Sequence, residues 1–102
     1  MITDGSGLSV VGLALLRRNK DKLLPPVSLE LKVMGGKQVM LLTGTTDSFW
    51  SSSFGWGRAD ERSQALFTAL DELGCPMPLE QIQLLDPDGD HTFRGARWAT
   101  QD

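Results

Sequence analysis

The segment over residues 27–43, which reads VSLELKVMGGKQVMLLT, constrains the fold more than any other part of the chain. Apolar and polar side chains alternate over its first half, as they do in a strand with one buried face. Gly35 and Gly36 then precede a second apolar stretch. Because glycine accepts the positive φ angles of a two-residue turn, the pattern predicts a β-hairpin in which Leu29 faces Leu42 and Met34 faces Lys37.

This register assigns every hairpin residue to one of two faces. The predicted core face carries Leu29, Leu31, Val33, Met40 and Leu42, and the other face carries Ser28, Glu30, Lys32, Val39, Leu41 and Thr43. The second face is more apolar than a solvated face should be, and more charged than a core face should be. We therefore expect Val39 and Leu41 to form an interface, most simply in a homodimer. The competing interpretation covers them with the N-terminal helix.

The remaining segments predict a small α+β domain over residues 1–102. Residues 1–7 read as a flexible lead-in, and residues 9–22 as a helix that Pro25 and Pro26 end, although the valines and Gly12 leave a strand open over 8–24. A second helix is expected over 59–73, and two strands over 79–85 and 91–99 around a DPDG turn, with a bulge at Gly95. The order α-β-β-α-β-β predicts a mostly antiparallel sheet with helices packed on one face.

Composition indicates a soluble globular protein. Of the 102 residues, 40% are hydrophobic and 23% are charged, which is ordinary for one domain. The longest apolar run, Leu8 to Leu16, is too short to cross a membrane, and no basic residue precedes it as in a signal peptide. The only cysteine, Cys75, cannot form an internal disulfide, so we expect a cytoplasmic protein. From the short apolar run we expect no association with a membrane.

No motif in the chain indicates catalysis, a metal or a cofactor. The only thiol and the only imidazole, Cys75 and His91, belong to no activating constellation, and together they supply too few ligands for zinc. The acidic stretch over 86–91 lacks the spacing of an EF-hand loop and is better explained as a turn. No glycine-rich phosphate motif follows a strand. We therefore expect no catalytic residue, no metal site and no cofactor.

Residues 44–58 form the least ordinary segment, a long connection rich in serine and glycine. Within it, the run FWSSSFGW over 49–56 holds four of the seven aromatic residues. These rings either plug one end of the sheet or form a recognition loop, since binding residues favour loops on a rigid scaffold. We expect Phe49 and Trp56 to be anchored and Trp50 and Phe54 to be exposed. The predicted binding residues are Trp50, Phe54, Trp56, Arg58 and Asp47.

Three functions remain open at this point. The first is a non-catalytic interaction protein that acts through a protein partner or through self-association. The second is a small-molecule-binding protein or minor enzyme, whose pocket is walled by the 49–56 aromatic segment with polar contacts from Asp47, Ser51 or Arg58. The third is a nucleic-acid binder that uses the basic group Arg17, Arg18, Lys20 and Lys22. The net charge of −3 argues against this third function.

Overall fold

The predicted hairpin is the centre of the sheet. In the computed structural model, which describes residues 1–94, strands β2 (Pro26–Met34) and β3 (Lys37–Gly44) pair antiparallel. Gly35 and Gly36 make the turn with φ angles of 59° and 80°. Leu29 faces Leu42, and Met34 faces Lys37, so the predicted register is confirmed. A bulge interrupts the ladder near the start of β2.

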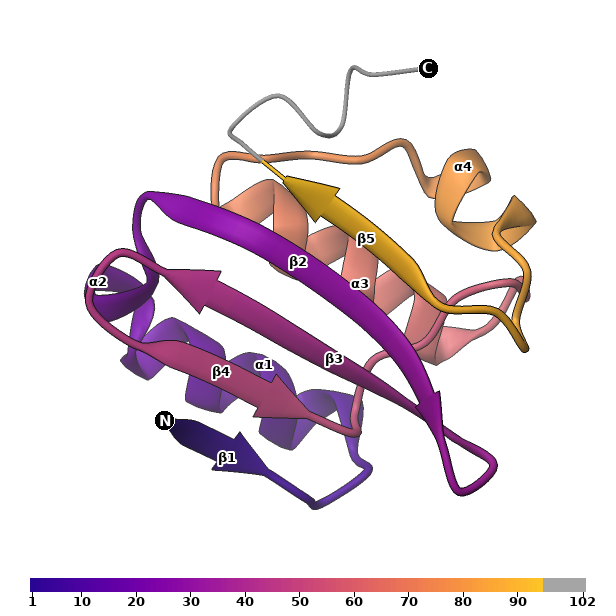
Figure 1. The fold of residues 1–102 in the computed structure, drawn as a ribbon, viewed down its shortest axis with the longest axis horizontal. Coiled ribbons are helices and arrows are strands. Elements are labelled where there is room, and N and C mark those ends of the chain that lie inside the picture. Colours follow the sequence, from indigo (N-terminus) through magenta and orange to yellow (C-terminus); the bar gives the residue numbers. More distant parts are fainter. Residues whose placement is uncertain (95–102) are drawn as a thin grey trace.

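Three further strands extend this hairpin on both sides. They are β1 (Ile2–Asp4), β4 (Ser48–Ser51) and β5 (His91–Arg94). Within residues 1–94 the strand order is β1-β4-β3-β2-β5, and the β1–β4 pair is parallel while the other pairs are antiparallel (Figure 1). The predicted class, an α+β fold with a mostly antiparallel sheet, is confirmed.

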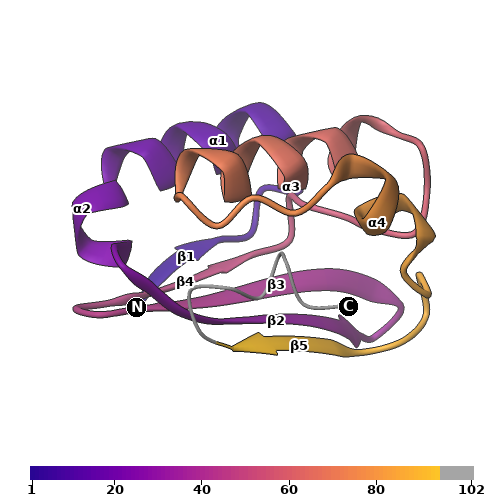
Figure 2. The ribbon, with the colours of Figure 1, turned by 90° about the horizontal axis from the view of Figure 1, so that it is seen from above.

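The helices lie together on one face of the sheet, as Figure 2 shows. They are α1 (Ser9–Arg18), α2 (Lys20–Leu23), α3 (Glu61–Glu72) and α4 (Leu79–Leu84). The predicted helix over 59–73 is confirmed as α3, whose N-cap Asp60 accepts a hydrogen bond from the Ser63 amide at 2.9 Å. The open choice over 8–24 is settled in favour of helix. None of the helices in the described chain combines the length and the apolar character needed to span a membrane.

The core fills the space between this helical layer and the sheet. Of the predicted core face of the hairpin, Leu29, Leu31, Met40 and Leu42 are fully buried and Val33 is partly buried. Helix α2 packs closely against the end of β3. A Cβ atom built on Gly44 would lie 2.5 Å from the Cα of Leu23, so only glycine fits there.

Several predictions about individual segments are wrong. The lead-in over 1–7 contains β1, and the connection over 44–58 contains β4, because β4 pairs with β3 of the hairpin and β1 then pairs with β4. Residues 79–84 form helix α4 and not a strand, and only Ile82 is fully buried in it. Strand β5 therefore pairs with β2, not with 79–85. The predicted bulge at Gly95 and the end of the strand over 91–99 lie outside the described residues.

Candidate functional site

The face of the sheet opposite the helices carries three apolar side chains in a row. Val39 and Leu41 lie on β3, and Trp50 on β4 is the direct Cα partner of Leu41. We call Val39, Leu41 and Trp50 the outer-face strip. Two separate predictions meet here, because the expected interface residues of the hairpin and one expected residue of the aromatic segment are neighbours across strands β3 and β4.

The outer-face strip is separate from the core. None of the three belongs to the core cluster between sheet and helices. Val39 is buried at 4% exposure, so the accessible surface of the strip comes from Leu41 and Trp50, which are half-buried. Within residues 1–94 the Trp50 indole N–H has no hydrogen-bond acceptor and its ring has no aromatic partner. The alternative in which the N-terminal helix covers Val39 and Leu41 is wrong, because α1 packs on the opposite face (Figure 2).

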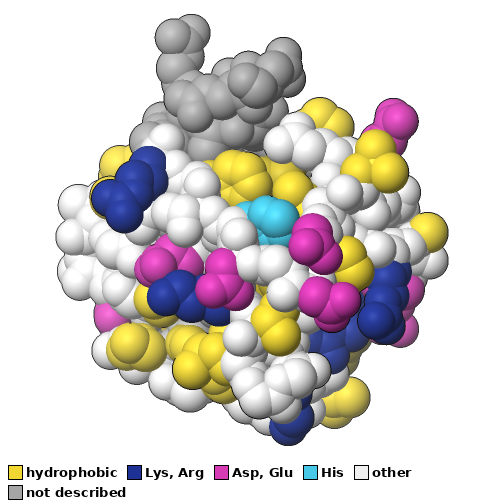
Figure 3. All heavy atoms as spheres, turned by 45° about the vertical axis from the view of Figure 1, so that its right-hand side comes forward, with side chains coloured by type: hydrophobic (Ala, Val, Ile, Leu, Met, Phe, Trp, Pro, Cys, Tyr) yellow, Lys and Arg dark blue, Asp and Glu magenta, His cyan; other side chains and the backbone are white. Residues whose placement is uncertain are grey.

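Polar and charged residues surround the strip on neighbouring strands. Glu30 faces Leu41 across the hairpin and forms an ion pair with Lys32 at 3.4 Å. Thr3 pairs with Trp50 on the other side. Figure 3 views this side of the molecule obliquely and shows apolar side chains in small groups bordered by charged ones. The strip is thus a narrow apolar surface with a charged border, which is the usual anatomy of a contact between proteins.

The other rings of the aromatic segment lie in the core. Phe49, Phe54 and Trp56 are each 0–1% exposed, and the rings of Phe49 and Phe54 meet edge to face at 6.4 Å. The Trp56 indole donates to the carbonyl oxygen of Asp86 at 3.1 Å. The anchoring of Phe49 and Trp56 is confirmed, but the expected exposure of Phe54 is wrong. A buried ring offers no surface to a partner, so Trp50 alone remains a candidate contact among these aromatics.

Two of the serines that made the 49–56 segment look like an exposed loop in the sequence are buried in the structure. Ser51 and Ser53, both fully buried, donate hydroxyl hydrogen bonds to the carboxylate of Asp4 at 2.8 and 2.5 Å. The amide of Ser6 donates to the same carboxylate at 3.0 Å. Asp4 is itself only 4% exposed, and no cation pairs with it in the described part of the chain. Ser51 and Ser53, which lie between the rings, therefore stabilise the buried carboxylate of Asp4 by hydrogen bonding.

The pKa of Asp4 reflects two opposing effects. Burial, the largest single cause, raises it, whereas the hydrogen bonds from Ser53, Ser6 and Ser51 lower it. The hydrogen bonds together prevail, so the pKa of Asp4 lies below its ordinary value. Sequence reasoning missed this cluster. The pattern DGSG near the N-terminus and the SSS run over 51–53 were its only signals, and neither reveals that they meet.

Asp47 and Arg58 do not join Trp50 in one site. Asp47 precedes β4, where it accepts a hydrogen bond from the Ser48 amide at 2.8 Å and pairs with the N-terminal ammonium group at 3.2 Å. These contacts lower the pKa of Asp47, the Ser48 bond most strongly. Arg58 is exposed beyond the other end of β4, beside a polar pocket. Residues of the 49–56 segment contribute Ser52 to that pocket but no ring, so the predicted aromatic wall is wrong.

Cys75 and His91 occupy structural positions. Cys75 is 1% exposed within the core cluster. The His91 ring meets Trp56 edge to face at 6.3 Å, and its Nε2 atom lies 2.9 Å from the carbonyl oxygen of Asp86. The predicted turn over 86–89 is confirmed by the bond from the Gly89 amide to the Asp86 carbonyl oxygen at 3.2 Å.

The side chains of the outer-face strip are suited to packing against another surface. They are apolar, and their border consists of hydroxyl groups and the Glu30–Lys32 ion pair. Groups of this kind exclude water and orient a partner surface. No protein-family model, curated protein or solved structure matches the chain.

Proposed function

We propose that this protein is a non-catalytic interaction protein that self-associates through the outer-face strip, most simply as a homodimer. One observation carries the proposal: Leu41 and Trp50 are direct cross-strand neighbours on the sheet face that the helices leave uncovered. Burying such a pair against a second surface removes apolar area from water, which is the main driving force for association. Trp is also among the residues that most often dominate binding energy.

A second copy of the chain fits this surface because its border contains both signs of charge. Glu30 and Lys32 lie on the same strand at the edge of the strip. A two-fold axis that crosses the strands midway between the levels of Glu30 and Lys32 would bring Glu30 of one copy toward Lys32 of the other, and this is the arrangement that we propose. Leu41 and Trp50 supply the accessible apolar area of the strip, so we expect a small interface and association in the micromolar range.

Two other expectations belong to this proposal. A cytoplasmic location is consistent with a single cysteine that needs no oxidising compartment. A different protein with its own apolar surface is the competing occupant of the strip. Nucleic acid is disfavoured as a partner because the net charge is −3, and Arg17 of the basic group is already paired with Glu72 through hydrogen bonds of 2.7–3.1 Å.

Sedimentation velocity of the full chain tests self-association. At tens of micromolar we expect a mass near twice the 11.2 kDa of one chain, falling toward 11.2 kDa on dilution. Leu41→Thr and Trp50→Thr should shift the protein to monomer, since threonine keeps a strand-compatible shape but removes apolar area. Val10→Thr is the matched control, because Val10 is 76% exposed on α1, away from the strip.

The outcomes separate the two occupants. A wild-type mass of 11.2 kDa at every concentration would overturn self-association and leave a different partner as the occupant. Equal weakening by Val10→Thr and Trp50→Thr would show that α1, not the strip, holds the copies together. Circular dichroism of each variant establishes that the fold is retained.

A further inference from the structure

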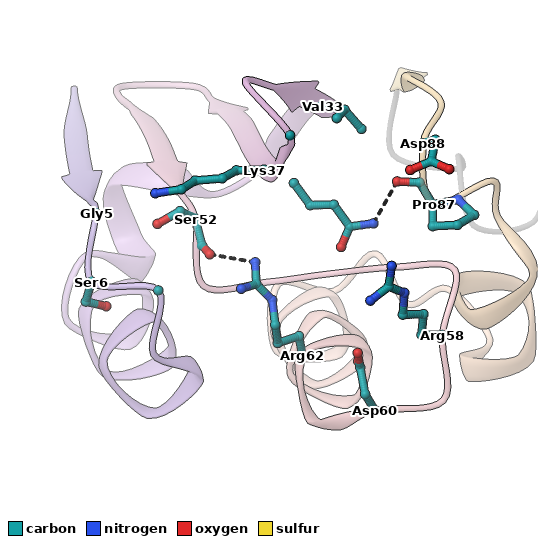
Figure 4. A pocket seen from close by; sticks show the side chains of 13 residues that line it. Gly5, Ser6, Val33, Lys37, Ser52, Arg58, Asp60, Arg62, Pro87 and Asp88 are labelled. Atoms are coloured by element: carbon teal, nitrogen blue, oxygen red, sulfur yellow. Dashed lines mark hydrogen bonds between the residues drawn. The ribbon is translucent and has the colours of Figure 1, made fainter.

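A polar pocket of about 390 Å³ lies at the end of the sheet where β1 and β4 finish and the β2–β3 hairpin turns. Figure 4 shows its walls, which come from the loop before α1, the hairpin, the loop before α3 and the turn after α4. Its volume falls within the range of roughly 300–1,000 Å³ that small-molecule sites occupy. The pocket is on a different part of the molecule from the outer-face strip, so a ligand can bind there whether or not the protein self-associates.

Three cationic side chains line this pocket, namely Lys37, Arg58 and Arg62. Within residues 1–94 none of them forms an ion pair with a carboxylate. Asp60 and Asp88 also line the pocket, which leaves one net positive charge in a protein of net charge −3. The carboxylate of Asp60 is occupied, because it accepts the Ser63 amide at the start of α3. An anion that enters the pocket therefore meets an excess of positive charge.

Arg62 is held in place by the surrounding backbone. Its Nη2 atom donates to the carbonyl oxygens of Ser52 and Phe54 at 2.7 and 3.1 Å, and in the described chain its other guanidinium donors have no acceptor. Gly55 makes room for it, since a Cβ atom there would lie 3.0 Å from the Arg62 Cβ and 2.9 Å from the Gln38 Oε1. Arg62 is therefore oriented before any ligand arrives, which lowers the entropic cost of binding.

The opposite wall is equally fixed. The Gln38 side-chain amide donates to the carbonyl oxygens of Trp56 and Pro87 at 2.9 and 3.0 Å, so it joins β3 to two separate loops. Figure 4 draws the bond to Pro87 and shows Lys37 extending toward Ser52 on the hairpin side, with Arg62 and Arg58 on the facing wall and Arg58 nearer Pro87. The pocket thus has rigid walls and two exposed cations, Lys37 and Arg58, that can adjust to a ligand.

We propose that this pocket binds the phosphoryl group of a small polar molecule through its cationic lining, Lys37, Arg58 and Arg62. Guanidinium groups match the oxygens of a phosphate in charge and in planar geometry, and lysine adds a point charge. The volume exceeds that of a single phosphate ion, so an organic part is accommodated beside the glycine- and serine-containing loop over 5–7. The lining is mostly polar, which favours a hydrophilic ligand over an apolar one.

Nuclear magnetic resonance titration of the ¹⁵N-labelled protein with sodium pyrophosphate, and separately with adenosine monophosphate, tests this proposal. We expect saturable shifts that include the amides of Gly5, Gly7 and Gly36, which line the pocket. The double variant Lys37→Gln/Arg58→Gln should weaken binding about tenfold or more, because it removes two charged hydrogen-bond donors that hold no other part of the described chain in place.

The control variant is Arg18→Gln/Lys22→Gln, which removes the same charge from exposed residues outside the pocket. We expect it to bind like the wild type. Equal weakening in both double variants, or a linear response without saturation, would overturn the proposal because it would indicate general charge attraction. Adenosine serves as the uncharged probe and should cause no shift at these amides. Tighter binding of adenosine monophosphate than of pyrophosphate would assign the rest of the pocket to an organic part, and the reverse order to a free anion.

Discussion

Truncation of Phe54 should mainly lower the stability of the fold, whereas truncation of Trp50 should mainly weaken self-association. Phe54→Ala removes a fully buried ring that contacts Phe49, whereas Trp50→Ala removes a half-buried ring from the outer-face strip. We expect Phe54→Ala to cost more free energy of unfolding at low protein concentration. We expect only the cost of Trp50→Ala to grow as concentration rises, because a dimer stabilises the folded state by mass action.

The structure sets the size of each effect. A buried aromatic side chain removes about 150–200 Å² from water, and at about 25 cal/mol per Å² this amounts to roughly 4–5 kcal/mol. That figure agrees with the range of about 3–5 kcal/mol measured when buried Phe or Trp is replaced by Ala. Partial exposure reduces the corresponding loss for Trp50 to roughly 1–2 kcal/mol in the monomer. The total stability of a domain is only about 5–15 kcal/mol, so the difference is measurable.

Urea unfolding at two protein concentrations provides the assay. For Phe54→Ala we expect a loss of about 3 kcal/mol or more at both concentrations, which corresponds to a fall in Tm of at least about 12 °C for a chain of this size. A loss below about 1 kcal/mol would refute the assignment of Phe54 to the core. A Trp50→Ala loss that equals the Phe54→Ala loss, with no dependence on concentration, would make Trp50 a core residue and remove the main support for self-association.

Two further predictions concern the framework of the fold. Gly44→Ala should destabilise the protein by about 1–3 kcal/mol in thermal unfolding, because its Cβ would overlap the Leu23 backbone, whereas Gly5→Ala, with no atom within 4 Å of the new Cβ, should change stability by less than about 0.5 kcal/mol. Acid unfolding should involve Asp4, whose folded pKa lies below the 3.8 of the free side chain: its contribution is present above pH 3.8 and is lost as pH falls through the folded pKa. Asp4→Asn should therefore flatten the pH dependence of stability below pH 3.8, and an unchanged acid profile would contradict this role of Asp4.

The sequence pattern predicted those elements correctly whose geometry depends on residues close together in the chain. The alternation over 27–34 and the Gly35–Gly36 turn predicted the hairpin, its register and its core face correctly. The apolar spacing over 59–73 predicted α3, and Gly74, with a φ of 77°, follows its end. In these cases the information lies within a few residues, and the distant contacts of the fold agree with it.

Prediction failed where the partner is distant in the sequence. Strand β1 has three residues and β4 has four; β4 becomes a strand beside β3, and β1 becomes one beside β4. Nothing within residues 1–7 indicates that pairing. The error over 79–85 has a different origin, because apolar residues at 79, 82 and 85 fit a helix as well as the apolar pair at 82 and 84 fits a strand.

Asp4 connects β1 to the serine-rich end of β4, a contact that the sequence did not predict. Its carboxylate holds Ser51 and Ser53, and so fixes the chain on either side of Ser52. The Ser52 carbonyl in turn orients Arg62 at the wall of the polar pocket. A buried carboxylate without a paired cation is costly in a protein interior, and it persists because three donors satisfy it. The same register that brings Asp4 beside Ser51 also places Thr3 beside Trp50 on the opposite face. The short parallel pairing of β1 with β4 therefore shapes both proposed surfaces, the pocket through its buried polar residues and the outer-face strip through its outward-facing ones.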